Sequence, residues 1–133
     1  VILIRYEGPV GGPGMKEMFI PQLLLQAQGT LDNVALITDG RFSNLGLGFC
    51  VSHIGPEAAL GGPIGLVKDG DMISISIKED IISVNLSNEE LEARRGLWKP
   101  RETLFLSAAE SKYKKLVSSA NKGAVTHEWC KLN

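Results

Sequence analysis

The sequence of 133 residues predicts a single α/β domain of mixed β-strands and short helices, arranged as a compact barrel or sandwich. The segment 33–38 is β-branched and apolar on both faces, as expected of a central strand that is covered on both sides. Isoleucines alternate with serines over 73–77, and apolar residues alternate again over 82–86, which predicts an antiparallel hairpin with one buried face. The 15 glycines, with 44% hydrophobic and 22% charged residues, indicate a globular chain that is rich in tight turns.

The first third of the chain alternates apolar runs with glycine and proline. The apolar run 1–6 predicts a buried strand, and it is closed by a glycine-rich turn over 8–14. A helix is expected over 21–27, because a proline can occupy its first turn and a glycine follows its last residue. The strand 33–38 then ends abruptly at Asp-Gly, and a loop over 39–48 follows.

The second half of the chain has clearer boundary signals. Residues 56–60 predict a short helix with proline at its first position, and a strand is expected over 64–67 before the Asp-Gly turn that precedes the hairpin. Ser87 and Glu90 have the spacing of a capping box, which predicts a helix from about Asn88 to Leu97 that is stopped by Pro100. A second helix with a basic end is predicted over 103–117, and 118–133 is expected to be a weakly specified tail.

Charge and cysteine usage exclude several classes of protein. The 14 basic and 15 acidic side chains nearly balance, so neither nucleic acid nor an anionic membrane is an expected partner. No apolar run approaches the roughly 20 residues of a membrane span. Cys50 and Cys130 have no metal-type spacing, and we expect both to be reduced thiols. The chain begins at Val1 without an initiator methionine, which suggests a fragment of a longer polypeptide, although processing would look the same.

Two segments contain candidate functional residues. Residues 39–43, Asp-Gly-Arg-Phe-Ser, follow a buried strand, and ligands usually bind outside the carboxyl ends of such strands, although a plain surface turn would look the same. Glu17 follows the glycine-rich turn and could ligate a hard cation such as magnesium, but one carboxylate does not make a site. The turn itself lacks the spacing of a phosphate-binding loop. His53 is a lone histidine and is expected to be a hydrogen-bonded structural residue.

Taken together, three stretches resemble the dihydroxy-acid dehydratase and phosphogluconate dehydratase family, and specifically its carboxy-terminal domain. These are RYEGP with GGPGMKEM over 5–18, LITDGRFS over 36–43, and HIGPEAA with GGPI over 53–64. The resemblance continues through DGD at 69–71 and LEARR at 91–95, so it covers most of the chain in order. Phe42 resembles the dihydroxy-acid branch of the family more than the phosphogluconate branch.

The resemblance implies a fold, an activity and roles for residues. The implied fold is a swivelling β/α barrel, with all of 1–133 forming one carboxy-terminal domain and the amino-terminal, cluster-binding domain absent. The implied activity is a hydro-lyase that converts a 2,3-dihydroxy acid to a 2-keto acid in branched-chain amino acid biosynthesis, using magnesium and an iron-sulfur cluster. Glu17 matches the magnesium ligand of this domain, and Ser43 matches the serine that removes the C2 proton. Arg41 and Asp39 are expected to bind substrate or to anchor the loop.

Other interpretations stay open beside this one. The sequence departs from the family pattern at 44–48, where Asn-Leu-Gly-Leu-Gly stands in place of a glycine-rich stretch with an arginine. A sugar-acid dehydratase domain or a non-catalytic structural module are the alternatives. The isolated domain is expected to be inactive, since the cluster ligands and most magnesium ligands would lie in the amino-terminal domain of the same polypeptide. The complete protein is expected to be an intracellular homo-oligomer, in cytoplasm or in a mitochondrion or plastid.

Overall fold

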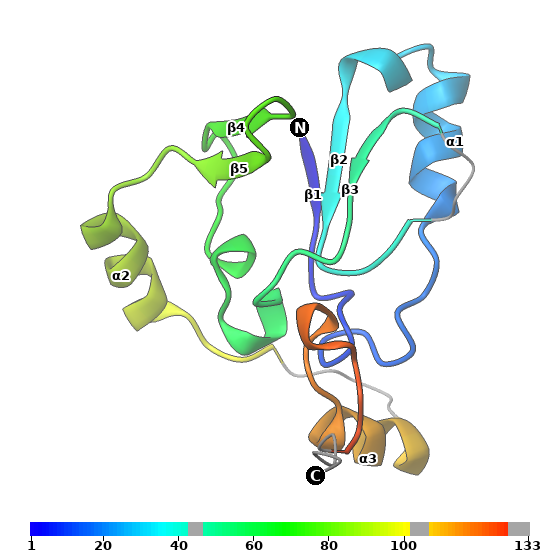
Figure 1. The fold of residues 1–133 in the computed structure, drawn as a ribbon, viewed down its shortest axis with the longest axis vertical. Helices are drawn as coiled ribbons and strands as arrows, with labels where there is room; N and C mark the ends of the chain where they lie inside the picture. Colours follow the sequence, from blue (N-terminus) through cyan, green and yellow to red (C-terminus); the bar gives the residue numbers. More distant parts are fainter. Residues whose placement is uncertain (43–46, 102–106, 128–133) are drawn as a thin grey trace, which may run out of the picture.

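The computed structural model describes residues 1–42, 47–101 and 107–127, which form a mixed α/β domain (Figure 1). Its centre is a parallel sheet of three short strands in the order β1-β2-β3. These strands span Ile2–Ile4, Ala35–Thr38 and Phe49–Val51. Ile37 pairs with Leu3 on one side and with Val51 on the other, so β2 is the central strand, as its two apolar faces predict. The strand β3 was not predicted.

Helix α1 (Phe19–Ala27) covers one face of this sheet. The buried side chain of Gln22 donates to Cys50 Sγ of β3 at 3.3 Å, and Thr38 Oγ1 of β2 lies 3.9 Å from Met18 Sδ, just before the helix. Leu36 is two positions before Thr38 on the same strand, so it points to the same side, and it is fully buried. The predicted helix 21–27 is confirmed, although it begins two residues earlier and Pro21 therefore lies at its third position.

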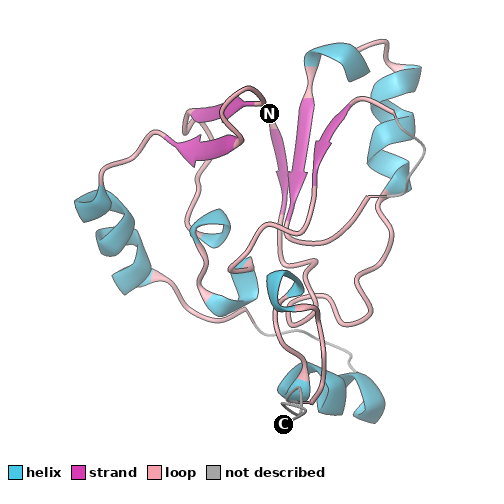
Figure 2. Ribbon diagram, in the orientation of Figure 1, coloured by secondary structure: helices cyan, strands magenta, loops and turns pink. Residues whose placement is uncertain are grey.

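The other face of the sheet packs against a second layer. Ile37, Ala58 and Ile64 form the buried cluster, and partly buried side chains of the sheet and the hairpin surround it. The hairpin consists of β4 (Ile73–Ser76) and β5 (Ile81–Val84), which pair antiparallel as predicted. Figure 2 shows the hairpin beside β1 and α1 beside β3, so that the sheet lies between them.

The segment between β3 and the hairpin corrects one prediction. Residues 64–67 were expected to form a strand, but Pro63–Gly65 is a 3-10 helix, η3, which follows another, η2 (Ala58–Leu60). The reason is tertiary: the Arg5 guanidinium donates to the carbonyl oxygens of Ile64, Gly65 and Val67, the last at 2.6 Å. These carbonyls are therefore bound by a side chain instead of a neighbouring strand.

Two further helices lie outside the sheet layers. Helix α2 spans Asn88–Leu97 as predicted, and Ser87 caps it by accepting from the backbone N–H of Glu90. Arg94 of α2 forms an ion pair with Asp71 at the start of the hairpin. Helix α3 is shorter than the predicted 103–117: it spans Ala108–Leu116, because Ser107 has extended backbone and forms a complete capping box with Glu110.

The residues after α3 contain one more short helix. A 3-10 helix, η4 (Ala120–Lys122), lies in the segment expected to be a weakly specified tail, and its flanks are joined by a hydrogen bond from Ser118 N to Val125 O. Ser119 is buried, and the side chain of Asn121 packs against Gly55. This part of the tail, up to residue 127, therefore packs on the loop that follows β3. None of the helices in the three described ranges is long and apolar enough to cross a membrane.

Candidate functional site

The candidate site is the edge of the sheet where β1, β2 and β3 end. The three strands are parallel, so their carboxyl ends meet at one edge (Figure 2). The loops after them bring together segments that are far apart in sequence. His53 N donates to Gly40 O at 2.9 Å, so the segments that follow β2 and β3 stay paired beyond the ends of these strands. Ligands of α/β sheets usually bind at this edge, outside the carboxyl ends of the strands.

Asp39 connects three of these segments. Its carboxylate is fully buried and accepts from the backbone N–H of Tyr6 at 3.1 Å and of Glu7 at 3.0 Å, both just after β1. It also accepts from the N–H of Ala58 at 2.8 Å, at the start of η2. A buried carboxylate that accepts from three backbone N–H groups fixes the positions of those groups relative to one another.

Glu57 is a second fully buried carboxylate, and it occupies the glycine-rich turn. Its oxygens accept from Val10 N at 3.1 Å and from Gly11 N at 2.8 Å. Burial raises the pKa of Glu57, and the two N–H groups partly offset this effect. The turn has the successive N–H groups of an anion-binding loop, although it lacks a phosphate-binding motif, and the anion it holds is a side chain of the same protein.

Two glycines of this region are required because the loops approach each other too closely to leave room for a side chain. A Cβ on Gly8 would lie 2.5 Å from Glu57 Oε2, and a Cβ on Gly40 would lie 2.7 Å from the carbonyl oxygen of Glu7. Either substitution would therefore separate loops that now touch. Nothing in the local sequence around Glu57 indicates a role in the site, since its partners lie 46 and 47 positions away.

Glu17 and Arg41 are brought together by the backbone. Glu17 pairs with Arg41 in an isolated parallel bridge, and Arg41 Nε donates to Met15 O at 2.6 Å. Both side chains are exposed at the sheet edge. Ser43, two positions after Arg41, lies outside the described residues. The segment that leads to Ser43 is thus held beside the segment that bears Glu17.

Glu7 adds a third carboxyl group near Asp39 and the turn. Burial raises its pKa, the negative charge of Asp39 raises it further, and Lys16 and Arg101 act in the opposite direction. Sequence reasoning missed Glu7 as well as Glu57, because neither stands in a local pattern that indicates a role in the site. His53 is exposed and has a left-handed backbone conformation, with φ of 59°.

The described residues offer few ligands for a metal ion or an iron-sulfur cluster. Across the described ranges, no group of three or more His, Cys, Asp or Glu side chains converges as a metal site. Glu17 fits a magnesium site as one exposed oxygen ligand, which would need further ligands from elsewhere. Cys50 does not fit a cluster: its thiol accepts from Gln22 and donates to Leu47 O, and burial raises its pKa, which disfavours the thiolate that a cluster needs. Cys130 lies outside the described residues.

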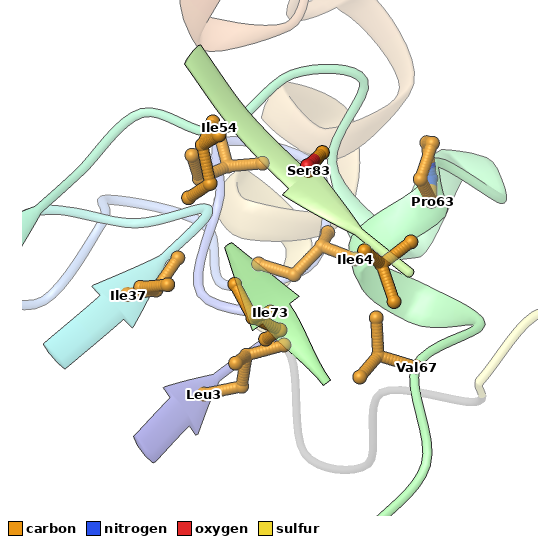
Figure 3. Close-up of a pocket in the computed structure, with 10 residues that line it drawn as sticks. Leu3, Ile37, Ile54, Pro63, Ile64, Val67, Ile73 and Ser83 are labelled. Atoms are coloured by element: carbon orange, nitrogen blue, oxygen red, sulfur yellow. The ribbon is translucent and has the colours of Figure 1, made fainter. Parts of the chain in front are cut away.

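Two hollows lie away from this edge. One is a cavity of about 100 Å³ between the sheet and the hairpin, and Figure 3 shows its aliphatic lining, which includes Leu3, Ile37 and Ile73. Ser83 is the one polar side chain among its lining residues, so this hollow is apolar. The other, of about 610 Å³, lies along the start of β1, where Asp71 is already paired with Arg94.

The structure is therefore that of an α/β domain in which the exposed side chains of Glu17 and Arg41 lie beside loops that buried carboxylates hold in place through hydrogen bonds. Residues 1–124 match the family described as Dihydroxy-acid/6-phosphogluconate dehydratase C-terminal. The chain belongs to this family, which confirms the resemblance inferred from the sequence.

Longer relatives support the same family membership. The chain is 56% identical over 127 residues to the dihydroxy-acid dehydratase of Parvibaculum lavamentivorans, and 57% identical over 127 residues to dihydroxy-acid dehydratase 2 of Mesorhizobium japonicum. It is 52% identical over 126 residues to the dihydroxy-acid dehydratase of Trichodesmium erythraeum. The matches cover 95–96% of this chain but 22% of each relative. The chain therefore spans about a fifth of the length of these relatives.

Proposed function

We propose that this chain is the carboxy-terminal domain of a dihydroxy-acid dehydratase, a hydro-lyase of branched-chain amino acid biosynthesis. Family membership and relatives that bear this name support the proposal. The structural observation that carries it is the bridge between Glu17 and Arg41, which holds the proposed magnesium ligand beside the segment leading to the proposed base, Ser43. The reaction would remove water from a 2,3-dihydroxy acid and give a 2-keto acid.

In this mechanism Ser43, as an alkoxide, accepts the C2 proton of the substrate and becomes a neutral hydroxyl. The C3 hydroxyl then leaves and takes up a proton, so that the net change is the loss of one water, and the resulting enol tautomerises to the keto acid. Bound magnesium would supply positive charge that acidifies the C2 proton and stabilises the alkoxide of Ser43, the form of the serine that acts as the base. Glu17 would be the ligand that this domain contributes.

Arg41 and Asp39 have different proposed roles. Arg41 anchors the loop through its Nε, which donates to Met15 O, and its two terminal nitrogens form the fork that suits a substrate carboxylate. Asp39 is a loop anchor, because its buried oxygens are already used by three backbone N–H groups. A direct contact between Asp39 and substrate would require these hydrogen bonds to break.

The remaining parts of the site are proposed to belong to the rest of the complete protein. Relatives are much longer than this chain, and Cys50 does not fit a cluster, so the iron-sulfur cluster and the other magnesium ligands are assigned to an amino-terminal domain. The complete protein is proposed to be an intracellular homo-oligomer in which this domain has the swivelling β/α barrel arrangement. The isolated domain is proposed to be inactive.

The test is an anaerobic keto-acid assay on the complete protein with its cluster and magnesium bound, using dihydroxyisovalerate and, in parallel, phosphogluconate. We expect turnover of dihydroxyisovalerate and its loss in the Ser43→Ala variant. Ser74→Ala, on an exposed serine of the hairpin, is the matched control and should retain activity. Preference for phosphogluconate would favour the sugar-acid branch, and full activity of Ser43→Ala would refute the proposed base and favour a non-catalytic module.

A further inference from the structure

Glu57 lies at the centre of the glycine-rich turn and has no part in the mechanism above. Its carboxylate is fully buried, and the hydrogen bonds it accepts come from the backbone of Val10 and Gly11. The turn is wound closely around it, since no Cβ could be added to Gly8 without meeting Glu57 Oε2. Without this carboxylate, two N–H groups inside the turn would lose their acceptor, which costs about 1–3 kcal/mol for each buried group.

The turn leads directly to Glu17. A hydrogen bond from Gly12 N to Gly8 O closes the turn, and one from Met15 N to Gly12 O continues it. Met15 is then held by Arg41 Nε, and Glu17 pairs with the backbone of Arg41. The segment that bears Glu17 is thus fixed from two directions: by Arg41 on the strand side and by Glu57 through the turn.

We propose that Glu57 is a positioning residue for Glu17 and thereby sets the affinity of the site for magnesium. This inference rests on the proposed function, in which Glu17 ligates the metal. Metal affinity depends on how closely the ligands are held to the productive geometry, and the loss of supporting hydrogen bonds typically weakens binding about 10- to 100-fold. Because Glu57 acts through the turn and not on Glu17 itself, the lower end of this range is expected.

The experiment is a calorimetric titration of magnesium into the complete protein, cluster-loaded and stripped of divalent metal, as wild type and as Glu57→Gln. Glutamine keeps the shape of the side chain but loses the charge and one acceptor oxygen. We expect about a tenfold increase in the magnesium dissociation constant. Glu57→Asp, which keeps the charge but withdraws it from the turn by one methylene, should show the same effect and carries the test if Glu57→Gln does not fold.

Two controls separate positioning from other causes. Leu36→Ala destabilises the sheet without touching the turn, so its magnesium affinity should stay within about twofold of wild type while its melting temperature falls. If Leu36→Ala weakens magnesium binding as much as Glu57→Gln does, the effect is general destabilisation and the inference is overturned. Glu17→Gln tests the proposed function separately, because it should weaken binding at least as much as Glu57→Gln.

The two possible failures are then distinguishable. If Glu17→Gln loses magnesium while Glu57→Gln and Glu57→Asp bind it as wild type does, Glu57 does not position the ligand, and the proposed role of Glu17 stands. If Glu17→Gln binds magnesium as wild type does, the proposed ligand is wrong, and an effect of Glu57→Gln would have to reach the metal through another group.

Discussion

Replacement of Asp39 by alanine is expected to destabilise the domain severely. The carboxylate is fully buried and accepts from three backbone N–H groups, two after β1 and one at the start of η2. Hydrogen bonds to a charged group contribute about 1.5–3 kcal/mol each, and removal of the carboxylate also removes the cost of burying it. The expected loss in the free energy of unfolding is therefore about 3–5 kcal/mol, which is the usual size for a broken buried charge network.

Asp39→Asn should cost less, because its one carbonyl oxygen can replace Oδ2, which accepts from both Tyr6 N and Ala58 N. The amide nitrogen would then face Glu7 N, and that hydrogen bond would be lost. We expect a cost of about 2 kcal/mol, since one bond is removed and two are no longer charge-assisted. The order of stability should be wild type, then Asp39→Asn, then Asp39→Ala.

The assay is equilibrium urea denaturation of the 133-residue chain at pH 7, with amide hydrogen exchange as a second measurement. Exchange should accelerate most at Tyr6, Glu7 and Ala58. Asp69→Asn, on an exposed aspartate, is the control and should change stability by less than about 0.5 kcal/mol. An Asp39→Ala protein within about 1 kcal/mol of wild type would refute the argument that this carboxylate holds the three segments together.

Three further predictions use the same chain. Glu7→Gln should raise the free energy of unfolding at pH 7, because burial and the charge of Asp39 raise the pKa of Glu7 in the folded protein. The gain should vanish as pH falls below the ordinary glutamate range, where the carboxyl is protonated in both the folded and the unfolded state. Equal gains at every pH would contradict this prediction. Asp71 has a pKa lowered to about 2 by Arg94, so its stabilising effect is present above about pH 4 and lost as pH falls toward 2; urea titrations should show that Asp71→Asn flattens this acid dependence. Ser107→Ala should lower the free energy of unfolding by about 1 kcal/mol, because α3 loses its cap. If the variant loses its helical circular dichroism on heating at the same temperature as wild type, the prediction is wrong.

Much of the fold was predictable where local sequence decides the structure. The apolar faces of β2, the alternation of the hairpin and the serine cap of α2 each act over a few residues, and each prediction was confirmed. The predicted strand over 64–67 was wrong because Arg5, about 60 positions away, binds the carbonyls of this segment. Strand β3 was missed because three residues after a glycine-rich loop form too short a pattern.

In the candidate site, too, some residues could be predicted from the sequence and others could not. Asp39 and Arg41 could be found from the sequence because they follow a buried strand, and family resemblance indicated Glu17. Glu57 could not, because a glutamate after a proline and before two alanines is typical of a surface helix. Its burial depends on Gly8, which leaves room for the carboxylate, and on Gly11, whose backbone N–H donates to it, and both lie in a loop that is remote in sequence.

The occupied turn also has a consequence for selectivity among small molecules. Loops of successive backbone N–H groups bind phosphate, and phosphorylated metabolites are abundant competitors for any such loop. In this protein the N–H groups of the turn are bound by Glu57, a carboxylate of the same chain. Its effective concentration at the turn is one that a freely diffusing anion does not reach. The turn is consequently closed to free phosphates, because its N–H groups already have an acceptor.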